Sequence, residues 1–221
     1  MESTADRAAW GIRALIVAGA YGAGDRLPAE RELAGELKLS RPALREGIRR
    51  LRSGGVLESR RGSGTYVSNV DVAGLFELRE RVEPLAAQRA ARLRDDGELA
   101  ELEQLVAEMH DTLDQPAVYD VADLKFHAAI AQASRSPVLI STLDMLTELG
   151  LLVRAATSMT KRVRISALSD VERIYAAIER QHPKRAANAM ERHILNVRSS
   201  YDGRIEAAAR IGRGDRPHAR A

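Results

Sequence analysis

The spacing of apolar residues changes near residue 70. Before that point, short apolar stripes alternate with turn residues and two brief strand-like segments. Beyond it, apolar residues recur every three or four positions over long stretches. The pattern predicts a mainly α protein, with a small N-terminal domain at 1–70 and an all-helical bundle at 71–209. Residues 210–221 are rich in Arg and Gly and have no long apolar period, so we expect a disordered tail there.

The N-terminal part carries an ordered set of elements. A short helix opens within 27–33, a tight turn follows at 38–40, and a second helix begins after Ser40, a good N-cap residue. Gly54-Gly55 ends that helix, and two strand-like segments then meet at Gly62-Ser63-Gly64, where glycine permits positive φ. A helix, a turn, a second helix and a hairpin wing in this order are typical of proteins that read duplex DNA.

The second helix has two distinct faces. Its apolar stripe is formed by Leu44, Ile48 and Leu51. Its basic stripe is formed by Arg41, Arg45, Arg49 and Arg52. Guanidinium groups can bond guanine or phosphate with two hydrogen bonds, and Arg60 and Arg61 flank a hairpin tip small enough to approach a minor groove. A merely solvated charged face would be the better reading of an isolated helix, but the ordered set favours DNA binding.

The C-terminal pattern predicts six or seven helices. The first is expected to bury the stripe Leu75, Leu78, Val82, Leu85 and Leu93. Later helices are expected from Pro116 to about Ala133, after Ser136-Pro137, and from Pro183 onward. A helical bundle is the economical way to bury so many apolar stripes.

Three polar residues stand out inside this bundle. Asp123 and His127 are four apart and share a helix face, and His193 is in line with the buried Met190 and Val197. A carboxylate and two imidazoles that converge can bind a divalent cation. Their spacing alone favours hydrogen-bonded core histidines instead.

Composition fits an intracellular regulator. The chain has 221 residues, 45% of them hydrophobic, and no cysteine, which excludes disulfides and cysteine-ligated metals. There is no signal-peptide pattern and no apolar run of membrane-spanning length, so we expect no membrane partner and a cytoplasmic, nucleoid-associated protein. Residues 1–70 carry 12 Lys and Arg against 8 Asp and Glu, whereas the rest carries 22 against 23. The basic excess therefore belongs to the N-terminal domain.

Residues 5–68 resemble the winged helix-turn-helix domain of the GntR family of bacterial transcriptional regulators. The matching segments are 24–34, 40–46 and 62–67. The resemblance implies that Arg31 clamps a phosphate or base, that Arg41 and Arg45 read the major groove, with Arg49 on the same stripe, and that Arg61 and Gly62 enter the minor groove. It also implies that Ser40 and Ala43 lie at the groove floor or the DNA backbone.

Residues 72–208 resemble the all-helical ligand-binding (FCD) domain of the FadR subfamily. The motifs are Glu77-Leu78-Arg79, Glu83-Pro84, 123–127 and 189–193. The resemblance implies that Asp123, His127 and His193 are ligands of a divalent metal such as Zn²⁺ or Ni²⁺. Two positions depart from it: Val171 stands where a further histidine is usual, and Ser136 where asparagine is frequent.

Some members of this subfamily bind an organic ligand without metal, and that alternative stays open. The resemblance places Arg79 at the pocket, where it would pair with an anionic effector; Arg154 is a second, weaker candidate. Without the resemblance, a surface ion pair between Arg79 and Glu83 would be the simpler reading.

Two other function classes compete with a ligand-controlled regulator. A metal-dependent enzyme at the three polar residues has no recognisable catalytic motif and would leave the DNA-reading domain unexplained. An architectural DNA-binding protein would need no polar pocket. We therefore predict a transcriptional regulator, and specifically a repressor, because repression is the commonest outcome in the family that the chain resembles. It is expected to act as a homodimer on a short inverted repeat and to respond to a small anionic metabolite such as an organic acid.

Overall fold

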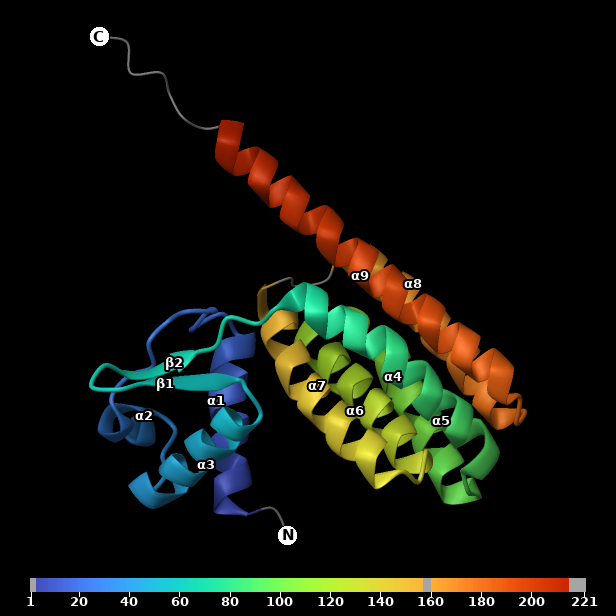
Figure 1. The fold of residues 1–221 in the computed structure, drawn as a ribbon, viewed down its shortest axis with the longest axis horizontal. Coiled ribbons are helices and arrows are strands. Elements are labelled where there is room, and N and C mark those ends of the chain that lie inside the picture. The colour runs from blue at the N-terminus through green and yellow to red at the C-terminus, as the bar shows by residue number, and fades with distance from the viewer. Residues whose placement is uncertain (1–2, 157–159, 215–221) are drawn as a thin grey trace.

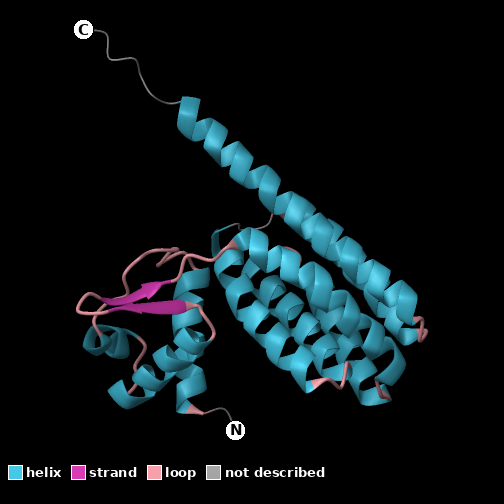
Figure 2. Ribbon diagram, in the orientation of Figure 1, coloured by secondary structure: helices cyan, strands magenta, loops and turns pink. Residues whose placement is uncertain are grey.

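A computed structural model describes residues 3–156 and 160–214. The N-terminal part contains α1 (Thr4–Val17), α2 (Glu30–Glu36), α3 (Arg41–Ser53), β1 (Leu57–Arg60) and β2 (Gly64–Val67). The C-terminal part contains α4 (Val72–Leu93), α5 (Asp96–Asp111), α6 (Pro116–Ala133), α7 (Pro137–Ala156), α8 (Lys161–Glu179) and α9 (Pro183–Gly214). The predicted mainly α fold is confirmed (Figures 1 and 2).

The helix-turn-helix unit forms as its sequence predicts. The Ser40 hydroxyl accepts a hydrogen bond from the Ala43 amide and begins α3, and Gly54 caps its C-terminus. Lys38 adopts a positive φ of 53° in the turn before it. Leu44, Ile48 and Leu51 are buried in a core shared with α1, α2 and the hairpin, so the predicted apolar stripe is confirmed.

The wing is an antiparallel pair in which Leu57 faces Val67 and Arg60 faces Gly64. The two strand-like segments expected from the sequence are therefore present, and Gly64 belongs to β2 rather than to the tip. The segment before α2 also joins the hairpin, because Arg26 forms a bridge with Tyr66. Sequence patterns did not reveal this third partner, which ties the loop preceding α2 to the wing.

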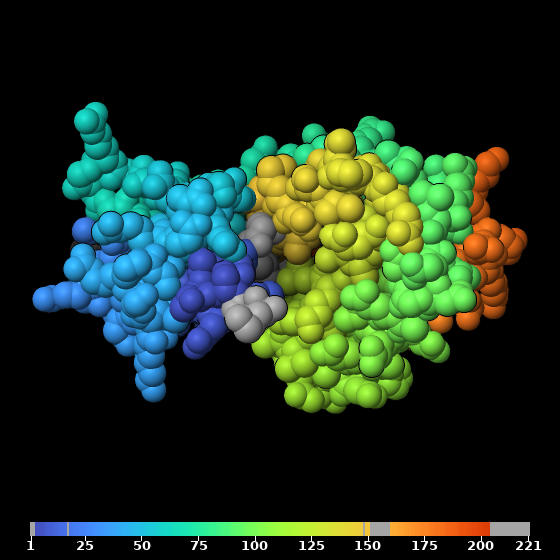
Figure 3. All heavy atoms as spheres, turned by 90° about the horizontal axis from the view of Figure 1, so that it is seen from below, coloured from blue at the N-terminus to red at the C-terminus, as the bar shows by residue number. Residues whose placement is uncertain are grey.

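Within the described residues, six helices form the C-terminal bundle, at the lower end of the predicted number. α4 packs against α9, α6, α7 and α8, so it lies at the centre of the arrangement (Figure 1). Figure 3 shows the N-terminal part as a separate lobe beside the bundle. The two lobes touch where α1 meets α7, and Val70, between them in the chain, packs against both hydrophobic cores.

The prediction of which face of the first bundle helix is buried was wrong. Leu78, Leu85 and Leu93 are exposed by 39%, 46% and 42%. The buried face of α4 instead carries Leu75, Phe76, Arg79, Glu83, Ala86, Ala87, Ala90 and Ala91. Alanines allow neighbouring helices to approach closely, so a face of small residues can enter the core while larger leucines remain outside.

The last helix is longer than predicted. It continues to Gly214, past the expected boundary at residue 209. The rest of the expected tail, 215–221, is outside the described residues. Among the described helices, none combines the length and apolarity required to cross a bilayer.

Candidate DNA-binding surface and metal-ligand cluster

The basic face of α3 is exposed. Arg41, Arg45 and Arg49 all lie on the surface, and α2 places Arg31 on the surface as well. A groove of about 900 Å³ runs along this face. It is lined by Glu30, Arg41, Pro42, Arg45, Glu46, Ile48, Arg49, Arg52, Ser59 and Thr65. The helix-turn-helix therefore presents its arginines together, beside the wing.

Two of these arginines are paired with acidic side chains. Arg45 Nη2 lies 3.0 Å from Glu30 Oε2, and Arg49 Nη2 lies 2.6 Å from Glu46 Oε1. The hydrogen bond from Arg49 lowers the pKa of the Glu46 carboxyl below its ordinary value. Exposed ion pairs of this kind contribute only about 0–1 kcal/mol, so the guanidinium groups can exchange a carboxylate for a base edge or phosphate at little cost.

The wing tip is small and projects into solvent. Gly62 has a φ of 73°, and a Cβ built on it would meet no atom within 4 Å. The Arg60 side chain lies against the strands of the wing, because it pairs with Glu58 and its guanidinium lies 4.1 Å from the centre of the Tyr66 ring. Arg61 is exposed at the tip. Of the two wing arginines, Arg61 is therefore the better placed to enter a groove.

Ser40 and Ala43 lie at the start of α3. Ser40 is exposed and uses its oxygen as the helix cap, whereas Ala43 is half-buried. Their neighbours Arg41 and Arg45 extend outward from the same turn. The amide groups at such a helix N-terminus favour an anion.

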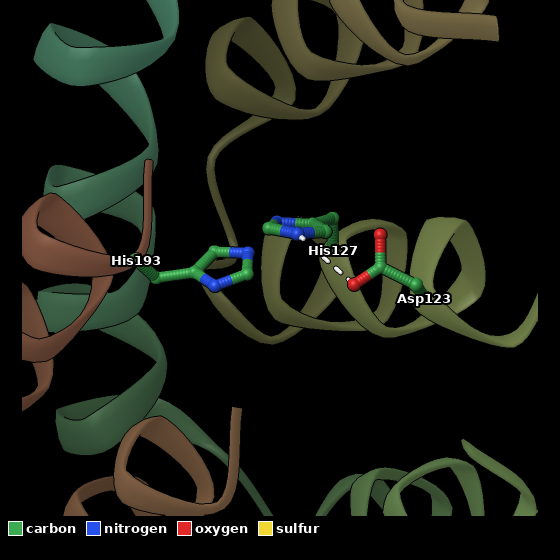
Figure 4. A group of neighbouring side chains, drawn as sticks. All are labelled: Asp123, His127 and His193. Atoms are coloured by element: carbon green, nitrogen blue, oxygen red, sulfur yellow. Dashed lines mark ion pairs between the residues drawn. The ribbon is translucent and has the colours of Figure 1, made fainter. Parts of the chain in front are cut away.

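The bundle interior brings together Asp123 and His127 from α6 and His193 from α9 (Figure 4). Each offers a ligand atom within 4.8 Å of the other two, and the side chains of all three are buried. His127 Nε2 is 3.9 Å from Asp123 Oδ1, and the two imidazole rings stack with centroids 5.3 Å apart. The spacing alone favours hydrogen-bonded core histidines, but no imidazole nitrogen of His127 or His193 has a hydrogen-bond partner among the described residues.

The residues present fit a divalent cation. Both nitrogens of His193 and Nε2 of His127 are buried and have no hydrogen-bond partner in the structure. Two ligands of one tetrahedral Zn²⁺ stand about 3.3 Å apart, so small side-chain movements would bring these atoms together. Burial and the nearby His127 lower the pKa of His193 to about 4, so its imidazole is neutral near pH 7 and keeps a lone pair for a metal.

Arg79 and Glu83 extend this cluster along α4. Arg79 Nε donates to Glu83 Oε1 at 2.5 Å, and Glu83 Oε2 lies 2.5 Å from His127 Nδ1. Burial acts to raise the pKa of Glu83, but the charges of Arg79 and His127 outweigh it and hold that pKa below its ordinary value. The simpler alternative named Glu83 as the partner of Arg79, and the structure has this pair, but it is buried and not on the surface.

Glu83 is the residue that sequence reasoning missed as part of the site. The signal in the sequence was its position four residues after Arg79. The prediction that the leucines of α4 form the buried face placed Arg79 and Glu83 on the exposed face instead. Val171 lies fully buried in the apolar core, where it contributes volume and no ligand atom. Arg154, the second anion-binding candidate, has a side chain outside the described residues.

Comparisons with known proteins agree with both halves of the molecule. Residues 4–67 match the model described as bacterial regulatory proteins, gntR family, and residues 74–196 match the FCD domain. LutR of Bacillus subtilis (strain 168), an HTH-type transcriptional regulator, is 28% identical over 206 residues, or 83% of this chain and 94% of LutR. The Uxu operon transcriptional regulator of Escherichia coli (strain K12) is 29% identical over 211 residues, or 85% and 82% of the two chains.

Among solved structures, E. coli McbR/YncC matches with a TM-score of 0.78 at 18% identity, over 92% of this chain and 99% of that one, which shows the shared fold. These domains and relatives are those of transcription regulators and not of enzymes. A DNA-binding GntR domain followed by an effector-binding FCD domain makes this chain a member of the GntR family of bacterial transcriptional regulators.

Proposed function

We propose that this regulator is a repressor whose DNA affinity is set by a small organic acid bound with a divalent metal at Asp123, His127 and His193. The observation that carries the proposal is the set of buried imidazole nitrogens without partners, since such groups are costly unless a ligand satisfies them. The motifs around these residues also favour the FadR subfamily within the GntR family.

Zn²⁺ and Ni²⁺ are among the divalent cations that imidazole ligands suit. Bound there, either ion would act as a Lewis acid that attracts a carboxylate. Three protein ligands leave coordination positions for the effector, and the apolar Val171 supplies no fourth ligand. Metal affinity should then depend on whether a chelating acid is present.

We propose that Arg31, Ser40, Arg41, Ala43, Arg45, Arg49, Arg61 and Gly62 contact DNA. Arg41, Arg45 and Arg49 would lie in the major groove and the Arg61–Gly62 tip in the adjacent minor groove. Two copies of the chain would bind an inverted repeat through their two-fold symmetry. Exposed Leu78 and Leu85, seven residues apart on α4, support association of two bundles.

The route between the two sites is short in this fold. α6, which carries two of the three ligands, packs against α7, and α7 contacts α1 of the DNA-binding domain. A ligand can change DNA affinity only by binding one arrangement of the domains more tightly than another. Relatives include both a transcriptional repressor and a transcriptional activator, so the sign of the response is part of the test.

The test uses the full chain and a DNA sequence that it selects from a random pool. Operator affinity is measured by fluorescence anisotropy with Ni²⁺ or Zn²⁺ alone and with added acetate, L-lactate or citrate. We expect metal with a chelating acid to weaken operator binding about 5–150-fold, the usual range of allosteric coupling. Acetate, which chelates poorly, should act less than L-lactate or citrate.

Calorimetry decides whether metal is involved. We expect Val171→His to tighten Zn²⁺ or Ni²⁺ binding, because an added imidazole is a good ligand for both ions. Thermal unfolding checks that the larger side chain is tolerated in the core. If the wild-type chain and a folded Val171→His variant both fail to bind metal, the three residues form the polar wall of a purely organic site.

A further inference from the structure

A continuous line of buried contacts crosses from α4 to the metal-ligand cluster. Arg79 donates to one oxygen of Glu83, and the other oxygen of Glu83 lies 2.5 Å from His127 Nδ1. The side chains of Arg79, Glu83 and His127 are exposed by only 9%, 5% and 6%. These groups therefore interact with little screening by water.

The two nitrogens of His127 face different groups. Nδ1 faces Glu83, whereas Nε2 is 3.9 Å from Asp123 Oδ1, too far for a hydrogen bond. A neutral imidazole has one N–H and one lone pair, and a carboxylate can only accept. The nearer carboxylate should therefore hold the proton on Nδ1 and leave the lone pair on Nε2, which points into the cluster.

We propose that Glu83 is a positioning residue, which fixes the tautomer and ring orientation of His127 so that Nε2 is ready to bind a metal. The Nδ1–Oε2 contact is short enough for a hydrogen bond, although its geometry in the structure is not that of one. Carboxylates that orient a metal-binding histidine in this way are typical of metal centres.

Arg79 has a defined part in this arrangement. Its charge cancels that of Glu83, so the pair adds no net charge to the cluster. Asp123 then supplies the one carboxylate charge that Arg79 does not cancel. Metal binding requires both imidazoles to be unprotonated, so a bound divalent ion would leave a single positive charge for the effector. This consequence rests on the proposed metal site, and it favours an anionic chelating group at the open coordination positions.

The experiment separates this role from general stability. The single variant Glu83→Leu leaves the Arg79 charge buried and unpaired, which can unfold the bundle. The double variant Arg79→Met/Glu83→Leu removes both charges and keeps similar volumes. Its matched control is Arg198→Met/Glu80→Leu, which removes an Arg–Glu pair between α9 and α4, with atoms 2.9 Å apart and without contact to His127.

The first readout is the ¹⁵N chemical shifts of the His127 ring in metal-free protein at neutral pH, assigned with His127→Ala. We expect Nδ1–H in the wild type and in the control pair, and a shift toward Nε2–H in Arg79→Met/Glu83→Leu, where Asp123 is the remaining carboxylate beside the ring. The second readout is Ni²⁺ affinity by calorimetry, which should fall about 10–100-fold in that variant alone.

An unchanged tautomer in the folded Arg79→Met/Glu83→Leu variant would overturn the proposal. Equal loss of Ni²⁺ affinity in the control pair would overturn it too, since the effect would then come from general loosening of α4. If the wild type binds no Ni²⁺, the metal site fails, but the ¹⁵N shifts of the metal-free protein still decide the role of Glu83.

Discussion

The two domains hold their charged groups in opposite ways. In the DNA-binding domain, the side chains of Arg45 and Arg49 are 68% and 69% exposed, and each has an acidic neighbour. In the bundle, the side chains of His127 and His193 are almost completely buried, and none of their ring nitrogens has a hydrogen-bond partner among the described residues. Electrostatic interactions are screened in the first region and barely screened in the second.

This difference shows how to interpret each set of residues. An exposed ion pair is weak, so an arginine can leave a carboxylate for DNA without destabilising its domain. A buried imidazole without a partner costs about 1–3 kcal/mol, so its presence requires an explanation such as a ligand. Exposed groups should therefore govern DNA affinity, whereas buried groups should govern the response to a ligand. Four substitutions test this division.

The largest effect is expected from His127→Ala. Removing one of three ligands should weaken Ni²⁺ binding at least about 100-fold, beyond what loss of an orienting partner causes. Operator affinity without effector should stay at the wild-type value, because the substitution is inside the bundle. Calorimetry and anisotropy measure the two quantities. His110→Ala, at an exposed histidine of α5, is the control; an equal loss of Ni²⁺ binding there would contradict the assignment.

Arg45→Ala should weaken operator binding by about 1–3 kcal/mol and relax discrimination at one base position, because a bidentate contact to a base is lost. The response to metal and acid should remain. Arg50→Ala is the matched control on α3, since Arg50 faces α1 and pairs with Asp6. Binding to a set of single-base operator variants gives both quantities, and equal behaviour of the two variants would place the reading face elsewhere.

Gly62→Ala should cost about 1–2 kcal/mol in the wing, because an L side chain is strained at positive φ and no neighbour restricts the space. Operator affinity should fall with it, since the tip would no longer hold its shape. Gly35→Ala in α2, where no atom opposes a Cβ, should be neutral or stabilising. Thermal unfolding and anisotropy on the same samples test this; an unstrained Gly62→Ala variant would refute the role of the tip.

The smallest effect is expected from Arg31→Ala. If Arg31 contacts phosphate, its loss should weaken binding to all sequences about equally and reduce the slope of log affinity against log salt by about 1. Titrations at several salt concentrations, on operator and on unrelated DNA, measure this slope. A base-specific loss with an unchanged slope would instead assign Arg31 to direct readout.

Local signals in the sequence were sufficient for much of the fold. Ser40 and Gly54 mark the two ends of α3, because capping depends only on residues close in the sequence. Pro116, Pro137 and Pro183 begin helices for the same reason. The spacing of Asp123 and His127 placed them on one helix face. Such features need no knowledge of distant parts of the chain.

Tertiary structure decided the rest. Which face of α4 is buried depends on how closely α6 and α9 approach, and the small side chains of Ala86, Ala87 and Ala90 allowed that approach while Leu78 and Leu85 stayed outside. This choice buried Arg79 and Glu83 and set Glu83 against His127. His193 joins the cluster from α9, 66 positions after His127 in the chain. Periodicity cannot predict this contact, because packing between helices, and not spacing within one helix, determines which residues meet.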